Sequence, residues 1–269
     1  MKSVKVILLS VVAALLVGCG TPSTVPITGR KQHLLVSDEQ VLSLSNQQYQ
    51  EYMKKAKPST NAQNAALVKT VGQKLANAVV TYLNEHGLGN EVSQYAWEFN
   101  LVQDKNINAF CMPGGKIVVY EGLLPVTQDE ASLAIVLGHE IAHAVAKHSA
   151  ERLSNEYKKQ YGIGIVSAVA QGAGVSGSVA QLGQLAMTYG ASIWSAGFSR
   201  SQESEADHMG LIFAAMAGYN PEVAVDFWQR MSSATGGGSS SIFSDHPTDA
   251  KRIQQIKGWL PEAKGYYKP

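Results

Sequence analysis

The stretch Gly138-His139-Glu140-Ile141-Ala142-His143 decides the fold of this chain. It continues an apolar run that begins at Ala131, directly after Thr127-Gln128-Asp129-Glu130, which has the spacing of a helix N-terminal capping box. The pattern predicts one long helix that runs to about Lys158 and carries the two histidines near its middle.

These two histidines are spaced to share a metal ion. Residues four apart differ by about 40° around an α-helix, so His139 and His143 face one point. Neutral imidazoles bind zinc at about 2.0 to 2.1 Å, and three protein ligands leave a position for a water molecule whose pKa falls to about 7. Glu140 projects about 100° from His139, where it can take a proton from that water as it attacks a peptide carbonyl. Two histidines and a glutamate can also occur at this spacing by coincidence. A zinc site needs a third protein ligand, which must come from elsewhere in the sequence.

A second acidic stretch, Glu203-Ser204-Glu205-Ala206-Asp207, offers that ligand. It lies on a helix that we expect to be capped by Ser199, to run through Met216 and to end at Gly218. Glu203 and Asp207 share one face, so Glu203 can bind the metal while Asp207 accepts a hydrogen bond from a ligand histidine and fixes its tautomer. Acidic pairs at this spacing are commonly solvated faces. After the histidine stretch, this pair indicates the second half of a metal site.

The remaining pattern predicts a mainly helical α+β fold. Further helices are expected from Ser37 to before Pro58, from about Asn61 to His86, from Asn220-Pro221 to about Met231, and after Asp245-His246-Pro247 to about Leu260. Strands are expected at Tyr95 to Val102, Ile107 to Cys111 and Lys116 to Tyr120, the last two joined by the turn Pro113-Gly114-Gly115. Together these strands predict a small antiparallel sheet beside the histidine helix.

Two stretches show other compositions. No charged residue occurs from Tyr161 to before Arg200, and the apolar runs there are broken by glycine and polar residues too often for a membrane span, so we expect close-packed helices near the active site. Gly236-Gly237-Gly238-Ser239-Ser240-Ser241 predicts a flexible loop.

The N-terminus has the features of a bacterial lipoprotein signal. Lys2 and Lys5 precede an apolar run that ends in Leu16-Val17-Gly18-Cys19, with small residues at the cleavage position. We expect residues 1–18 to be removed, Cys19 to be lipidated, residues 19–36 to form a tether and residues 37–269 to form a single domain. Gly20 after the cysteine favours the outer membrane, facing the periplasm. The alternative is an ordinary secretory signal with a chance cysteine.

Composition excludes one class of partner. The chain has 269 residues, of which 45% are hydrophobic and 16% are charged, as in an ordinary globular protein. Its formal charge of +1 comes from 22 basic and 21 acidic residues that are evenly interspersed, so no nucleic-acid partner is expected. If Cys19 carries lipid, Cys111 has no disulfide partner, and the core, together with any bound metal, must stabilise the fold.

The chain resembles the zinc metallopeptidases of the HtpX, BepA and LoiP type, which are gluzincins and are related to the CAAX prenyl proteases and the Oma-type mitochondrial proteases. The resemblance extends from about Pro26 to Ile256. It rests on Asn108-Ala109-Phe110 with Pro113-Gly114-Gly115, on Gly138 to His143, on Ser199-Arg200 with Glu203 to Asp207, and on His246-Pro247 with Arg252.

The resemblance implies a zincin-like domain that binds one zinc ion per chain through His139, His143 and Glu203, with Glu140 as general base. It also implies that His246 stabilises the oxyanion or occupies the fourth zinc position, and that Arg252 supports that charge. From the residues alone, His246 is a loop histidine before a proline. The glycine-rich loop ahead of it predicts that His246 moves between a blocking and a catalytic position.

Asn108, Ala109 and Phe110 are expected to form an edge strand beside the cleft, where an extended substrate adds by main-chain hydrogen bonds. An ordinary paired strand is the alternative. The other histidines match no motif, and His148 is expected to face away from the ligand pair. Surface or core roles are therefore predicted for His33, His86, His148 and His208.

Three functions are open at this point. The first is a lipid-anchored endopeptidase that cleaves unfolded or misassembled envelope proteins. The second is an envelope chaperone or binding module with a normally latent protease site. The third is hydrolysis of another amide, such as a peptidoglycan cross-link. The chain has neither the tetratricopeptide region nor the spanning helices of some of these relatives, so their assembly and prenyl-protease roles are not expected here.

Overall fold

The computed structural model describes residues 21–156, 158–159, 197–235 and 250–268. Several predictions concern residues outside these ranges. They are the lipoprotein signal with Cys19, nearly all of the uncharged stretch after Tyr161, the glycine-rich loop from Gly236, and the position of His246.

A three-stranded sheet lies at the centre of the fold. Its strands β3 (Glu98–Val102), β4 (Ala109–Met112) and β5 (Lys116–Tyr120) occur in the order β3-β5-β4. The predicted hairpin of β4 and β5 is antiparallel, and Gly114 and Gly115 adopt φ of 85° and 81° in its turn. In contrast to the predicted purely antiparallel sheet, β3 pairs parallel with β5. Alternating hydrophobicity marks the faces of a strand but carries no information on its direction.

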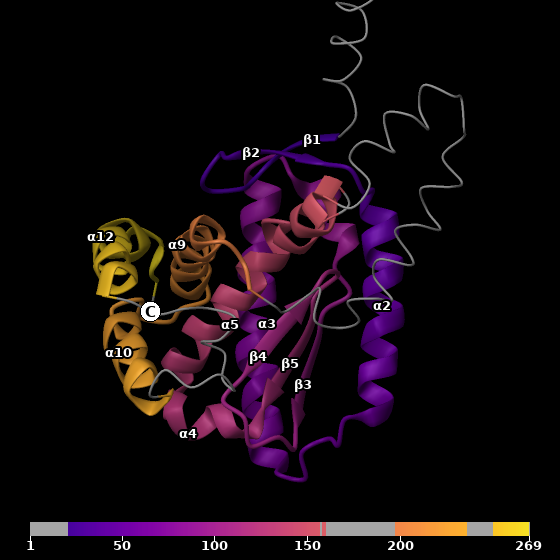
Figure 1. The fold of residues 1–269 in the computed structure, drawn as a ribbon. Helices are drawn as coiled ribbons and strands as arrows, with labels where there is room; N and C mark the ends of the chain where they lie inside the picture. The colour runs from indigo at the N-terminus through magenta and orange to yellow at the C-terminus, as the bar shows by residue number, and fades with distance from the viewer. Residues whose placement is uncertain (1–20, 157, 160–196, 236–249, 269) are drawn as a thin grey trace, which may run out of the picture.

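Two long helices cover this sheet, and both begin where the sequence predicted. Helix α2 (Asp38–Lys55) starts with a complete capping box between Ser37 and Gln40. Helix α3 (Ala62–Glu85) is capped by the side chain of Asn61. Short helical elements join the helices to the strands: η1 (Gly89–Gln94) lies between α3 and β3, and η2 (Glu121–Leu123) and α4 (Leu124–Thr127) follow β5. In Figure 1, α2 and α3 flank the sheet.

Helix α5 (Glu130–Val145) carries the histidine stretch but differs from the predicted helix at both ends. Its N-cap is Asp129, whose side chain accepts from the Ser132 N–H at 2.6 Å, whereas Thr127 ends α4. The prediction of a helix that continues to Lys158 is wrong, because Lys147 adopts a φ of 56° and interrupts it. The chain becomes helical again at residue 148. The Lys147 ammonium is held by Asp38 at 2.9 Å and by Glu91 at 3.4 Å, which stabilises this unusual backbone.

Among the residues that the structure describes, three helices lie on the other side of α5. Helix α9 (Arg200–Met216) begins at the predicted cap Ser199, which forms a capping box with Gln202, and it packs closely on α5. Helices α10 (Val223–Thr235) and α12 (Ala250–Tyr266) extend beyond their predicted ends, and α12 continues through Pro261. Figure 1 shows α9 between α5 and α12.

A small hairpin of β1 (Thr21–Thr24) and β2 (Lys31–Leu34) precedes α2. In Figure 1 it lies over one end of the α5 and α9 layer. Val25 in its loop is only 1% exposed and belongs to the main core. The described part of the predicted tether is therefore folded onto the domain.

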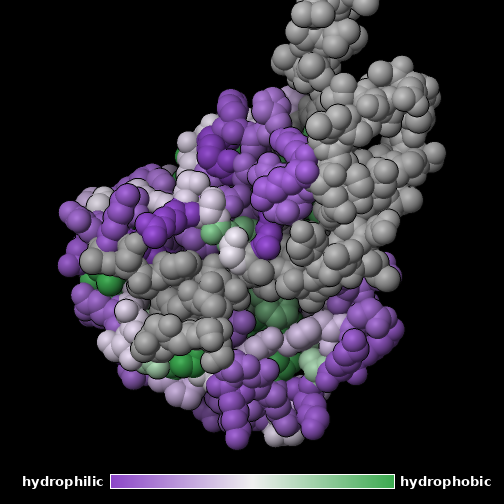
Figure 2. All heavy atoms as spheres, viewed as in Figure 1, coloured by the Kyte–Doolittle hydropathy of each residue, from purple (hydrophilic) through white to green (hydrophobic). Residues whose placement is uncertain are grey.

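The core confirms a mainly helical α+β fold. It joins the inner faces of α3, α5, α9 and the sheet, including fully buried Leu75, Ile117, Leu137 and Phe213. The described residues visible in Figure 2 are mostly hydrophilic, and hydrophobic ones form only small patches. Within the described ranges, we find no helix with both the length and the apolar character to cross a membrane.

Candidate metal centre

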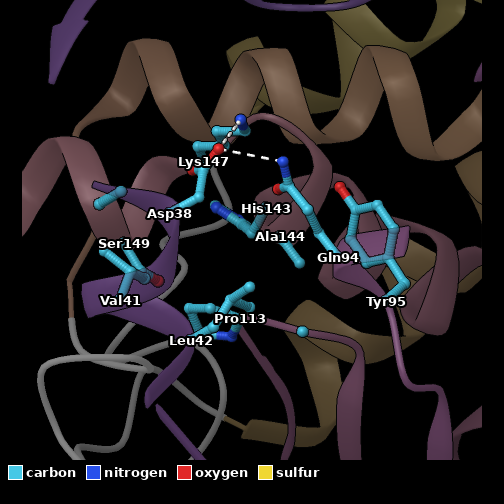
Figure 3. Close-up of a pocket in the computed structure, with 12 residues that line it drawn as sticks. Asp38, Val41, Leu42, Gln94, Tyr95, Pro113, His143, Ala144, Lys147 and Ser149 are labelled. Carbon is cyan, nitrogen blue, oxygen red and sulfur yellow. Dashed lines mark hydrogen bonds and ion pairs between the residues drawn. The ribbon is translucent and has the colours of Figure 1, made fainter. Parts of the chain in front are cut away.

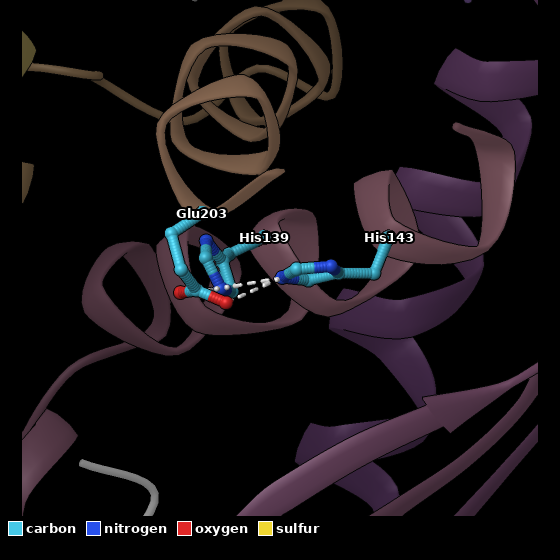
Figure 4. Close-up of side chains that lie close together, drawn as sticks. All are labelled: His139, His143 and Glu203. Carbon is cyan, nitrogen blue, oxygen red and sulfur yellow. Dashed lines mark hydrogen bonds and ion pairs between the residues drawn. The ribbon is translucent and has the colours of Figure 1, made fainter. Parts of the chain in front are cut away.

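Helices α5 and α9 bring three potential metal ligands together. His139 Nε2 and His143 Nε2 lie 3.1 Å apart. The Glu203 carboxylate on α9 lies 3.5 Å from the first and 3.4 Å from the second. Figure 4 shows all three side chains pointing at one another across the helix interface. All three are buried, so the predicted two-helix site exists in the fold.

Asp207 holds the outer nitrogen of His139. Its Oδ1 lies 2.9 Å from His139 Nδ1, as predicted from the shared face of Glu203 and Asp207. Arg252 on α12 clamps the same carboxylate with Nε at 2.6 Å and a second nitrogen at 2.8 Å. The guanidinium also stacks 3.9 Å from the Trp228 ring centroid. Arg252 thus anchors the group that orients a ligand.

The charges of this cluster are strongly coupled. Burial opposes ionisation of Asp207, but Arg252 and His139 lower the pKa of that carboxyl. Burial also opposes protonation of His139, yet its hydrogen bonds to Asp207 and Glu203 raise its pKa to about 9. The surroundings of His139 Nε2 therefore favour a positive charge, which a metal cation can provide in place of a proton.

This donor set fits a zinc ion. The candidate ligand atoms of His139, His143 and Glu203 all lie within 4.8 Å of one another. Each histidine uses Nδ1 for a hydrogen bond and directs Nε2 at the common point. Two imidazoles and one carboxylate form the ligand set of catalytic zinc sites that keep one position open.

His148 and Glu205 also belong to the site, although the sequence did not point to them. His148 Nδ1 lies 2.8 Å from His143 Nδ1, and His148 Nε2 lies 2.9 Å from Glu205 Oε2. Burial lowers the pKa of His148 despite the nearby Glu205, so the ring is neutral. The prediction that His148 faces away is wrong because it assumed one continuous helix. No glycine or proline marks the interruption at Lys147, so no sequence signal could have revealed it.

Glu205 holds His148 in place and is itself held by several hydrogen bonds. Burial opposes its ionisation, but hydrogen bonds from His148, Thr28 and Arg30 lower its pKa to about 2. Arg30 Nε donates to it at 2.8 Å, while the other guanidinium nitrogens bind Glu151 at 2.8 and 3.0 Å. The β1–β2 hairpin is therefore tied to a residue two positions from Glu203.

A small pocket lies beside His143, between the start of α2, the β4–β5 turn and the end of α5 (Figure 3). Asp38 closes one side, where it accepts from Lys147 at 2.9 Å and from Gln94 at 3.0 Å. These bonds tie α2 to the turn that follows His143, and so fix the path that brings His148 back to the site.

The other predicted site residues occupy different positions. Glu140 is 3% exposed. Asp207, Glu203 and then Glu140 raise the pKa of Arg252, and burial followed by the charge of Glu140 raises the pKa of the Cys111 thiol, so the Glu140 carboxylate lies near both groups. Strand β4 is an edge of the described sheet; it contains Ala109 and Phe110, and Asn108 directly precedes it. Tyr120 N–H donates to the Asn108 carbonyl at 3.0 Å, so the alternating antiparallel pattern directs the backbone groups of Ala109 away from β5. His246 and Cys19 lie outside the described residues.

Comparison with known proteins agrees with this geometry. A model of peptidase family M48 matches residues 62–260. The mitochondrial metalloendopeptidase OMA1 of Schizosaccharomyces pombe is 39% identical over 175 residues, which are 64% of this chain and 49% of the relative. The metalloprotease LoiP of Escherichia coli is 31% identical over 228 residues, which are 82% of this chain and 81% of the relative. The chain thus spans about half of the length of the fission-yeast relative and most of the bacterial one.

Proposed function

Because this chain belongs to peptidase family M48, we propose that it is a zinc-dependent endopeptidase that hydrolyses peptide bonds of unfolded or misassembled envelope proteins. The convergence of His139 Nε2, His143 Nε2 and the Glu203 carboxylate supports this proposal most directly. The names of relatives that are metalloendopeptidases or metalloproteases support the same reaction class.

Each residue of the site has a defined task in this reaction. When bound, zinc supplies a Lewis acid that activates water and polarises the substrate carbonyl. Glu140 accepts the proton of the attacking water and returns it to the leaving amine. Asp207, itself held by Arg252, keeps the Nδ1 proton of His139 in place and leaves Nε2 for the metal. His246 is proposed to stabilise the oxyanion, and Arg252 to support its charge.

An extended polypeptide is the proposed substrate. It would add to the outer edge of β4, where the backbone groups of Ala109 and Cys111 point away from β5 and the Ala109 N–H donates to the Asn108 side chain at 2.9 Å. Recognition of backbone groups suits unfolded chains of varied sequence. Ala109 and Cys111 are 1% and 3% exposed, so pairing requires the residues that cover this edge to move.

We place the protein in the bacterial envelope, anchored to the outer membrane by lipid on Cys19 and facing the periplasm. The four residues Leu16-Val17-Gly18-Cys19 support the anchor, and Gly20 supports the outer membrane.

One observation favours a second candidate, an envelope chaperone or binding module with a latent protease site. His139, His143 and Glu203 are 2%, 2% and 4% exposed, and the β4 edge beside them is buried as well. A site in this condition must open before a polypeptide can reach it.

Hydrolysis of casein by the purified full-length protein tests the proposal. We expect activity that is lost on treatment with a chelator, restored by zinc, and abolished by Glu140→Gln. Glu222→Gln is the matched control, because Glu222 is exposed and pairs with Lys264 far from the metal site. Activity that survives both the chelator and Glu140→Gln contradicts the mechanism. Zinc binding without activity on casein or muropeptides favours the latent module.

A further inference from the structure

The two zinc-ligand histidines have different outer partners. His139 is oriented by a carboxylate, Asp207, at 2.9 Å from its Nδ1. His143 instead contacts a second histidine, His148, at 2.8 Å from its Nδ1. Outer partners of this kind fix the tautomer and the ring orientation of a ligand, and their loss weakens metal binding.

The hydrogen bonds from His143 through His148 to Glu205 can all be given one donor-to-acceptor direction. With Nε2 of His143 facing the metal position, Nδ1 carries the proton and donates it to His148 Nδ1. His148 then carries its own proton on Nε2 and donates it to Glu205 Oε2 at 2.9 Å. Every donor therefore meets an acceptor, and the chain of bonds ends on a carboxylate.

The N-terminal hairpin holds Glu205, the carboxylate at which these hydrogen bonds end. Arg30 Nε lies 2.8 Å from Glu205 Oε2, and Thr28 donates its hydroxyl to the other oxygen of the same carboxylate. The neighbouring Gln32 Nε2 donates to the Ala146 carbonyl at 3.0 Å, in the turn that precedes His148. Glu205 is buried beneath these contacts, so its position depends on them. The hairpin lies outside residues 62–260, which match the family model.

We propose that His148 and Glu205 form a positioning relay for the ligand His143, and that the N-terminal hairpin completes this relay through Arg30. The hairpin that directly follows the proposed lipid-bearing segment is then a working part of the metal site. His148 acts through His143 and does not touch the reacting atoms, so its effect appears first in metal affinity.

Zinc affinity of the full-length protein, measured by competition with a chromogenic chelator, tests the relay. His148→Leu fills a similar volume but offers no acceptor, and we expect it to weaken zinc binding about 10- to 100-fold. His148→Asn places an amide oxygen where Nδ1 stood, and we expect it to recover most of that loss. Glu205→Gln and Arg30→Ala should give smaller losses in the same direction.

His208→Leu is the matched control. His208 also pairs with a glutamate, Glu262, at 2.7 Å and stacks on Trp259, but it faces α12 rather than the metal site. We expect wild-type zinc affinity for this variant. Thermal melting of the metal-free proteins shows whether a variant is folded before its affinity is compared.

The outcomes separate the relay from the proposed function on which it rests. The relay is overturned if folded His148→Leu binds zinc with wild-type affinity. If His148→Leu fails to fold, wild-type zinc affinity in both Glu205→Gln and Arg30→Ala overturns it. An equal loss in His148→Asn and His148→Leu also contradicts it, because the acceptor would then be irrelevant. If the unmodified protein itself binds no zinc, the proposed zinc peptidase fails, and the relay fails with it.

Discussion

Gly138 of α5 and Gly210 of α9 lie backbone against backbone. A Cβ atom at Gly138 would stand 2.7 Å from the Gly210 carbonyl oxygen, and one at Gly210 would stand 2.7 Å from the His139 nitrogen. Real Cβ atoms do not approach backbone this closely. The two helices therefore cross at a distance that leaves no room for a Cβ atom, one residue before the first histidine of the candidate metal site.

Gly210→Ala is expected to force the two helices apart. Overpacking of this kind costs about 1–3 kcal/mol of folding stability, and it also moves Glu203 on α9 away from the histidines on α5. We expect a lower urea midpoint together with weaker zinc binding. Gly258→Ala on α12 is the control, because its Cβ would meet open space. Wild-type zinc affinity in Gly210→Ala contradicts the view that this contact sets the ligand spacing.

Arg252→Met is expected to destabilise the protein strongly. It leaves the Asp207 carboxylate buried without the cation that now holds it at 2.6 and 2.8 Å. Removal of one partner of a buried ion pair costs about 3–5 kcal/mol. The double variant Asp207→Asn with Arg252→Met should regain part of this loss in urea unfolding at neutral pH. A double-variant loss equal to the sum of the losses in Asp207→Asn and Arg252→Met shows that the two side chains are not coupled.

The low pKa of Glu205 predicts that the folded state loses stability as the pH falls. Its folded-state pKa of about 2 lies below the ordinary 4.5, so its ionised form stabilises the folded state at neutral pH. This contribution is complete above about pH 5 and disappears as the pH falls towards about 2. Urea midpoints measured in chelator over this range should fall less steeply for Glu205→Gln than for the unmodified protein. Parallel pH curves for the two proteins are the contrary result.

Much of the fold could be predicted because its signals are local. Ser37 and Ser199 are the caps that their side chains predicted, the second long helix begins next to Asn61 as expected, and the glycines after Pro113 form the expected turn. The meeting of His139, His143 and Glu203 was predicted from helical spacing within each of two helices together with the family resemblance, and the three side chains do lie together. In contrast, the parallel pairing of β3 and the return of His148 depend on contacts between distant segments. Lys147 has no intrinsic preference for its left-handed backbone, which Asp38 and Glu91 stabilise from elsewhere in the chain.

The two cysteines allow the proposed lipid anchor to be tested by counting thiols. Cys111 is 3% exposed, and burial together with the charge of Glu140 raises its pKa far above the ordinary thiol value. Because the thiolate is the reactive form, the folded protein should react with a thiol reagent only very slowly at Cys111.

In denaturant, Cys111 of the mature protein becomes reactive, whereas a lipidated Cys19 has no free thiol. We therefore expect one reactive thiol per mature chain after unfolding. A Cys19→Ser variant expressed with the same signal should also show one thiol, but it should no longer partition into detergent in a phase-separation assay. An ordinary secretory signal cut before a chance cysteine predicts two thiols for the unmodified chain and no difference in partitioning, and that result would refute the anchor.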